Sequence, residues 1–274
     1  DAIATIPDTI FVIDRPIIQN LVFNIIPPLY TGENDFQHPG NITNLSLLRG
    51  SRIRIIGEAS KILESAWVRL DDEHHDLFVQ QDRFSGTLLT HDKKTVVISI
   101  KDENGVNNLN PLNYQLNIID DTAPDLIVQS PSRQFELNES DLIGFDIQIS
   151  DDHGFSDAWI EYQIKAPEYL SQDTTLYQRK IAEIRLDVKS QQIYHDWDLA
   201  DFALAPEDEL HMHVFIADNN TLFGPSTTQS PLIIGRYPSL EDLFNRMEED
   251  EAKVEEYSED IHMTLEDVQE LVEE

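Results

Sequence analysis

The chain has 274 residues, of which 52 are acidic and 19 basic, so its formal net charge is −33. This excess excludes nucleic acid and anionic membrane surfaces as partners, because both require clustered Lys and Arg. The absence of cysteine excludes disulfides, thiolate metal sites and a cysteine nucleophile. The charge is typical of a protein that stays soluble in salty surroundings, or of one whose acidic face meets a cation or a basic partner.

Residues 1–26 contain two strand-like apolar runs, Ile10–Ile13 and Leu21–Ile26, with Pro16 between them. Proline is confined to strand edges and loops, so we expect a leading strand segment that precedes the first full module. The chain begins without Met, and its last residues lie inside a helical pattern with no cap. We therefore interpret it as a piece of a longer protein.

Residues 27–121 and 122–236 repeat one pattern. Both copies place an apolar pair 14 and 12 positions before a tryptophan, namely Ile53, Ile55 and Trp67, and Phe145, Ile147 and Trp159. Both then end in an alternating strand and an acidic turn. Short alternating runs between Gly, Asn, Asp and Pro predict a sandwich of about seven strands in each copy. The sequence predicts a mainly β chain of two tandem immunoglobulin-like (fibronectin-like) sandwiches with Trp67 and Trp159 in their cores.

The second copy is longer between its tryptophan and its last acidic turn. The extra residues lie at 165–187, where we expect an elongated hairpin at the edge of the sandwich.

Residues 239–274 predict an acidic amphipathic helix. Ser239 is a suitable N-cap, and apolar residues then recur at seven-residue spacing. The pattern predicts either the start of a coiled coil or a single helix packed on the second sandwich. Fifteen acids against two bases from Glu241 onward favour a partner helix, because like charges repel within an isolated one. The candidate interaction residues are Leu243, Met247, Val254, Tyr257, Ile261 and Val268.

Acidic residues also gather at the junction and in loops of the second copy. Carboxylates collected near a joint between β-sandwiches can bind Ca²⁺, whereas Asp and Asn in loops are also ordinary turn formers. The candidate calcium ligands are Asp120, Asp121, Asp151, Asp152 and Asp218. No phosphate-binding loop, nucleophile elbow or zinc-protease motif is present, so we predict no catalytic residues, no enzyme activity and no other cofactor.

An ordered series of short motifs resembles a family of large bacterial envelope proteins that carries a domain-of-unknown-function label. The motifs are Pro27–Gly32, Leu48–Ile53, Asp121–Pro124, Asp151–Phe155, Trp197–Leu199, Leu204–Asp208, Asp218–Asn219, Gly224–Pro225 and Pro238–Glu241. Glu207 stands where the family has Gly. The resemblance implies transmembrane helices upstream, tandem immunoglobulin-like domains outside the cytoplasm and a long acidic coiled coil downstream. It implies no activity.

The leading interpretation is a non-catalytic periplasmic or envelope scaffold within a protein anchored to the inner membrane, with the helix binding itself or another protein. One alternative is an adhesion module that holds Ca²⁺ or a glycan, for which Tyr169, Tyr177 and Tyr194 are the candidate aromatic residues. The other is an accessory domain of an enzyme whose catalytic part lies elsewhere.

Overall fold

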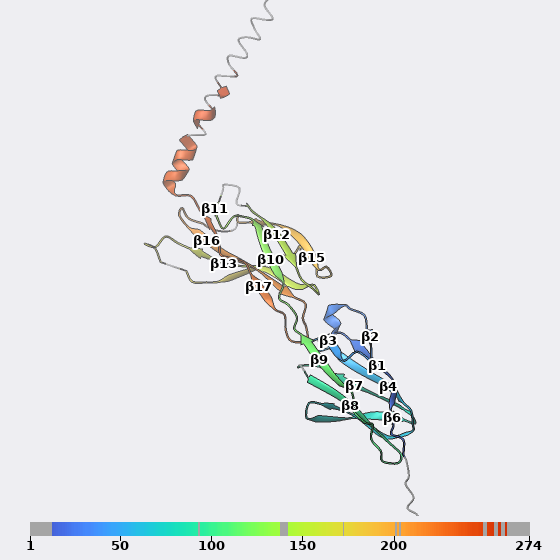
Figure 1. Cartoon of the computed structure of the whole chain (residues 1–274). Helices are drawn as coiled ribbons and strands as arrows, with labels where there is room; N and C mark the ends of the chain where they lie inside the picture. Colours follow the sequence, from blue (N-terminus) through green and yellow to red (C-terminus); the bar gives the residue numbers. More distant parts are fainter. Residues whose placement is uncertain are drawn as a thin grey trace, which may run out of the picture. The chain divides into compact units, whose positions relative to one another are not determined.

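The computed structural model describes residues 13–92, 94–137, 142–171, 173–200, 202, 204–248, 251–254, 257–258 and 261. The chain divides into two compact units (Figure 1). The first comprises Asp1–Thr122 together with Asn220–Gly224, and the second comprises Ala123–Asn219 with Pro225–Glu274. Each unit is a separate β-sandwich.

The described residues of the first unit form nine strands and one short 3₁₀ turn at Leu29–Thr31. The strands are β1 (Ile18–Ile26), β2 (Phe36–Pro39), β3 (Asn44–Leu48), β4 (Arg52–Ala59), β5 (Leu63–Leu70), β6 (Glu73–Gln80), β7 (Arg83–Leu89), β8 (Lys94–Asp102) and β9 (Asn113–Ile119).

Strand β6 belongs to both layers of the first sandwich. Its first part, up to Leu77, pairs with β5, and its end from Phe78 pairs with β7. One layer therefore has the order β2-β1-β4-β7-β6 and the other the order β6-β5-β8-β9-β3. The neighbours β1-β4-β7-β6 and β5-β8-β9 reproduce the two sheets of an immunoglobulin constant-type domain. Strand β3 adds a parallel partner to β9.

The core of the first unit reaches back before residue 27. Strand β1 pairs with β4, and its Phe23 and Ile25 are buried in the same cluster as Ile53 and Ile55. Alternate residues of β1 face the core, so this strand belongs to the first sandwich. The boundary predicted from the sequence, between residues 26 and 27, therefore falls inside the first unit.

In the part of the second unit that the structure describes there are another nine strands. They are β10 (Asp125–Ser130), β11 (Gln134–Glu136), β12 (Leu142–Ser150), β13 (Phe155–Lys165), β14 (Tyr177–Lys180), β15 (Ser190–Asp198), β16 (Glu209–Asp218), β17 (Thr227–Gln229) and β18 (Ile233–Arg236).

The second unit repeats the topology of the first. One sheet has the order β10-β12-β15, and the other has the order β11-β18-β16-β13-β14, in which β11 is parallel to β18 as β3 is to β9. The predicted elongated hairpin is β13–β14 with its connection, and β14 is an edge strand. The two tandem immunoglobulin-like sandwiches expected from the sequence are confirmed.

The placement of the two repeat tryptophans in the cores was wrong. Trp67 and Trp159 occupy equivalent positions on β5 and β13, but both are only half-buried on the outer face of their sheet. Trp159 stacks on Phe215 at a centroid distance of 5.2 Å, and Trp67 stacks on His74 at 5.7 Å. The inward positions of these strands belong to their sequence neighbours, because side chains alternate between the two faces.

The tryptophan in the core is Trp197 on β15. It is 0% exposed and is surrounded by the rings of Phe145, Tyr162 and Phe202, with centroid distances of 4.8–6.4 Å. It packs among Ile and Leu side chains from both sheets of the second unit. Trp197 therefore contributes more buried apolar area than either repeat tryptophan.

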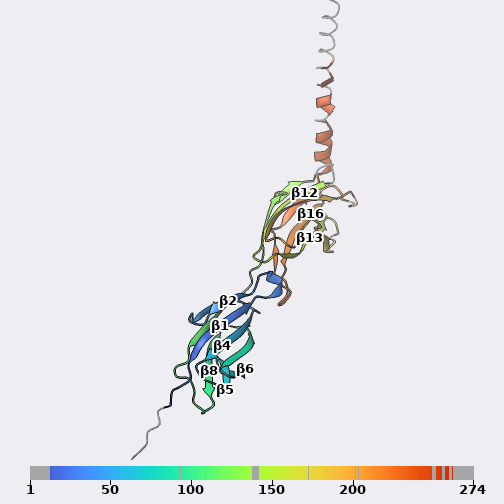
Figure 2. The same ribbon diagram turned by 90° about the vertical axis from the view of Figure 1, so that its right-hand side faces the viewer.

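A C-terminal helix begins at Leu240, and its described residues are 240–248, 251–254, 257–258 and 261 (Figure 2). Ser239 caps it as predicted, because the Ser239 hydroxyl accepts the backbone N–H of Asp242 at 3.1 Å. In return the Asp242 carboxylate accepts the Ser239 backbone N–H at 3.1 Å, which completes a reciprocal cap. Arg246 forms an ion pair with Glu136 on β11. Within the described residues, no helix is long and apolar enough to span a membrane.

Replacing Trp197 by Ala should lower the free energy of unfolding of the second unit by about 3–5 kcal/mol, because it removes a buried aromatic side chain and leaves a cavity. Trp159→Ala, on the outer face, should cost about 1 kcal/mol. Urea unfolding of both variants measures the difference. Equal losses would contradict the assignment of Trp197 as the core tryptophan.

Candidate functional site

Three of the five predicted calcium ligands lie together in the second unit. Asp151 and Asp152 lie between β12 and β13, and Asp218 ends β16, where it is paired in register with Phe155 of β13. The backbone N–H of Asn219 donates to the Gly154 carbonyl at 3.2 Å and joins the two segments. Gly154 has φ of +116°, a conformation that L side chains rarely adopt, and this allows the chain to turn sharply after the acidic pair.

The Asp151 carboxylate is partly buried and lies near two other negative charges. Its Oδ2 accepts the backbone N–H groups of His153 at 2.8 Å and Gly154 at 2.7 Å. Its Oδ1 is buried and accepts no hydrogen bond from the described residues. Burial raises the pKa of Asp151, the two backbone hydrogen bonds act in the opposite sense, and the charges of Asp152 and Asp218 raise the pKa further. Added positive charge at this position would relieve the repulsion.

Asp218 has a structural role that recurs in the first unit. It is buried, and its Oδ1 accepts the backbone N–H of Ser226 at 3.0 Å, which holds the loop after β16. The equivalent Asp102 is also buried, and its Oδ1 accepts the backbone N–H groups of Asn104 and Val106 at 3.0 and 2.9 Å. The acidic turns of the repeat are thus turn anchors in both copies.

Asp120 and Asp121 belong to the first unit, whose main segment ends at Thr122. The Asp120 carboxylate accepts a hydrogen bond from Nε of Arg49 at 2.6 Å in an exposed ion pair. The Asp121 carboxylate accepts from the side-chain amide of Asn220 at 2.8 Å, and Asn220 clusters with the first unit. Both side chains therefore have polar protein partners within their own unit.

Three of the six predicted interaction residues of the helix form an exposed apolar row. Met247, Val254 and Ile261 are 59%, 68% and 60% exposed, and each follows the previous one by seven positions. Leu240 extends this row by one repeat and is also exposed, and Tyr257 and Phe244 flank it. Leu243 is half-buried. Val268 lies outside the described residues. Apolar side chains so exposed at this spacing are typical of a helix that pairs with another helix.

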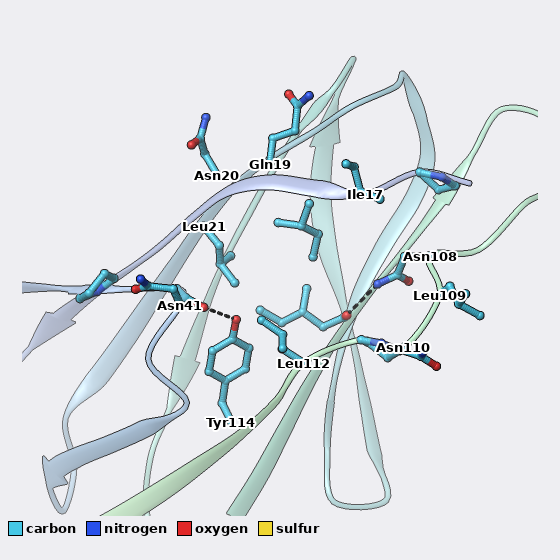
Figure 3. Close-up of a pocket in the computed structure, with 16 residues that line it drawn as sticks. Ile17, Gln19, Asn20, Leu21, Asn41, Asn108, Leu109, Asn110, Leu112 and Tyr114 are labelled. Carbon is cyan, nitrogen blue, oxygen red and sulfur yellow. Dashed lines mark hydrogen bonds between the residues drawn. The ribbon is translucent and has the colours of Figure 1, made fainter. Parts of the chain in front are cut away.

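The structure also shows a pocket that the sequence did not indicate. It has a volume of about 400 Å³ and opens in the first unit between the start of β1 and the connection from β8 to β9 (Figure 3). Pro16, Ile98 and Tyr114 are the buried residues of its lining, and the Tyr114 hydroxyl donates to the Gly40 carbonyl at 2.6 Å. The only sequence signal was the Asn- and Pro-rich run at 107–111, which reads as an ordinary loop.

No family model and no curated protein matches the chain. Solved structures that resemble it include fibronectin(III)-like modules of Clostridium thermocellum CbhA, at 9% identity over 73% of this chain and 91% of that one, with a TM-score of 0.25. Others are the I9–I11 tandem of titin, at 8% identity over 72% and 62% with a TM-score of 0.33, and the two immunoglobulin domains of DIP-gamma, at 8% identity over 82% and 98% with a TM-score of 0.26. The immunoglobulin-like assignment rests on the strand pairing described above.

Asp151→Asn should raise the free energy of unfolding at pH 7 in the presence of a chelator, by less than about 1 kcal/mol because solvent screens a half-exposed charge. The amide oxygen of Asn can accept the same two backbone hydrogen bonds, and the neutral side chain is not repelled by the charges of Asp152 and Asp218. The pKa of Asp151 is higher in the folded state than in the unfolded state. The ionised carboxylate therefore lowers the free energy of unfolding above that pKa, and this loss disappears as the pH falls toward the ordinary value of 3.8. The advantage of the variant should therefore shrink between pH 7 and pH 4.

Urea titrations at several pH values measure this difference. Asp125→Asn is the matched control, because it removes one exposed carboxylate from the same unit. If both variants change the free energy of unfolding equally, the change comes from net charge alone, and the local repulsion at Asp151 does not explain it.

Proposed function

We propose that this chain is a non-catalytic scaffold of a bacterial envelope protein, in which two immunoglobulin-like sandwiches carry a helix that pairs with the same helix of a second copy. The observation that carries the proposal is the exposed apolar row Leu240, Met247, Val254 and Ile261. A row that repeats every seven residues is complementary to an identical row on another helix, which is the geometry of a coiled coil.

The start of the helix is attached to the second unit, and this attachment supports pairing. The reciprocal cap between Ser239 and Asp242 fixes the start of the helix, and hydrogen bonds from Ser239 hold the pKa of Asp242 below its usual range. The ion pair between Arg246 and Glu136 joins the second turn to β11. The apolar row is thus presented to solvent by a helix that is attached to its sandwich.

The position of the chain in a larger protein is part of the proposal. The motif series from Pro27 to Glu241 supports a periplasmic or envelope location and an inner-membrane anchor in segments outside this chain. In that setting the two sandwiches act as an arm, and paired helices bring two arms together. The proposal assigns no chemical reaction to any residue.

The acidic cluster of the second unit supports a second candidate function, the binding of Ca²⁺. The observation that favours it is the buried Oδ1 of Asp151, which lacks a hydrogen-bond donor among the described residues and lies near Asp152 and Asp218. Carboxylate oxygens are the ligands that Ca²⁺ prefers. If the cation binds there, it should raise the melting temperature of the natural chain and leave that of Asp151→Asn unchanged. Equal responses of the two proteins to Ca²⁺ would contradict this candidate.

Val254→Asp combined with Ile261→Asp should abolish helix-mediated association, because two charges would enter the apolar row. Light scattering should report a mass above the 31.5 kDa monomer for the natural chain and the monomer mass for the variant. The salt concentration should be about 0.5 M, so that the acidic flanks are screened.

The matched control is Asn245→Asp with Ala252→Asp, which adds the same charge on the side of the helix opposite the row. It should keep the association of the natural chain. If both double variants lose association, the loss is an effect of net charge and not of the row. If the Val254→Asp and Ile261→Asp variant keeps the mass of the natural chain, the row is not the interface.

A further inference from the structure

Two histidines lie on the outer face of β16, in the larger sheet of the second unit. His211 and His213 alternate with the buried Leu210, Met212 and Val214, so both side chains point away from the core. Both rings are half-buried. Strand β16 is the middle strand of its sheet and is paired with β13 on one side and β18 on the other. The backbone that carries the two rings is therefore held on both sides.

Each imidazole is oriented by a hydrogen bond through one of its two nitrogens. Nδ1 of His213 lies 2.9 Å from the Ser230 carbonyl, which can only accept, so Nδ1 donates and the lone pair of the neutral ring is on Nε2. Nε2 of His211 lies 2.8 Å from the Glu209 carboxylate, so here Nε2 donates and the lone pair is on Nδ1. Histidines that bind metals generally donate their other ring N–H to a carbonyl or a carboxylate. Both rings have such a partner.

A carboxylate lies across the strand pair from these rings. Glu161 of β13 is paired in register with His213, and the next outward residue, Gln163, is paired with His211. Residues directly opposite each other in an antiparallel pair have Cβ atoms about 4.5–5.5 Å apart, and diagonal neighbours are about 7–8 Å apart. Glu161 is opposite one histidine and diagonal to the other, so its carboxylate can reach a point that both rings share. Its Oε2 accepts the side-chain N–H of Gln178 on β14 at 3.2 Å, which holds it on this face.

The donor atoms determine which cation fits this face. Two imidazole nitrogens and one carboxylate oxygen are a ligand set that Zn²⁺ uses in proteins, with a fourth position open to water. Ca²⁺ and Mg²⁺ take oxygen ligands instead. The net charge of −33 favours the approach of any cation to the surface. Lys165 is opposite Glu209, two register pairs beyond the pair of His213 with Glu161.

We propose that His211, His213 and Glu161 bind Zn²⁺ on the outer face of the second unit. His211 binds through Nδ1 and His213 through Nε2, and the Glu161 carboxylate supplies the third ligand. The sequence alone shows two histidines on one face of a strand, whereas the third ligand follows only from the pairing of β13 with β16. The site differs in donor chemistry from the carboxylates around Asp151 and is independent of the helix pairing proposed above.

Isothermal titration calorimetry of the metal-free full chain with ZnCl₂ tests the proposal, with about 1 mM Ca²⁺ present to occupy sites that are built from oxygen ligands. The natural chain should bind Zn²⁺ with micromolar or tighter affinity. His211→Gln combined with His213→Gln should abolish this binding, and Glu161→Gln should weaken it about tenfold or more. His74→Gln combined with His75→Gln is the matched control, because it makes the same change at two exposed histidines of β6, and it should bind as the natural chain does.

A second measurement reports the ligands directly. Co²⁺ should bind at the same site and give the visible absorption of a four-coordinate ion with nitrogen and oxygen ligands, and Zn²⁺ should displace it. Thermal melting of each variant in EDTA shows that it remains folded, so that lost binding is not lost structure. Absence of micromolar Zn²⁺ binding by the natural chain, equal loss in the two double variants, or full binding by Glu161→Gln would each overturn the proposal.

Discussion

Both sandwiches depend on the alternation of side chains along the central strand pairs β5–β8 and β13–β16. In each pair one set of alternate residues is buried, including Val68, Ile98, Ile160 and Val214, and these residues join the two sheets. A shift of one residue would expose the whole buried set, so the register of each pair is firmly specified. The outer face of each sheet, which carries Trp67 or Trp159, is determined by the same alternation.

The duplicated turns explain much of the acidic sequence in structural terms. Asp102 and Asp218 occur at equivalent strand ends, and both anchor the following loop by accepting backbone N–H groups. Their burial and their repetition indicate a role in folding that each unit needs for itself. Among the described residues, the apolar row of the helix and the pocket at the start of β1 have no such structural explanation. Both expose aliphatic groups.

The sequence predicted the class of fold, the duplication and the helix start because these depend on local patterns. Alternating runs indicate strands, and Ser239 with acids in the next turn indicates a cap. It also contained the signal that the tryptophans face outward, since Arg69 and Glu161 follow them by two positions and share their face. The size of the apolar ring points the other way, and it does not identify Trp197 as the tryptophan of the core.

Other features could not be predicted because they arise from contacts between distant segments. The inclusion of β1 in the first sandwich depends on its pairing with β4, and the pocket depends on the approach of the β8–β9 connection to the start of β1. The grouping of Asp151 and Asp218 depends on the adjacency of β13 and β16. The apolar row of the helix, by contrast, was visible in the sequence, and the structure adds Leu240 to it and shows its exposure.

The central claim is that association resides in an apolar row on an acidic helix and occurs between copies of this chain. Sedimentation velocity of the natural chain over a range of salt concentrations tests it most directly. Screening weakens repulsion between like-charged helices, so the account predicts that the mass rises above 31.5 kDa as salt increases. A mass that stays at the monomer value at every salt and protein concentration would contradict it.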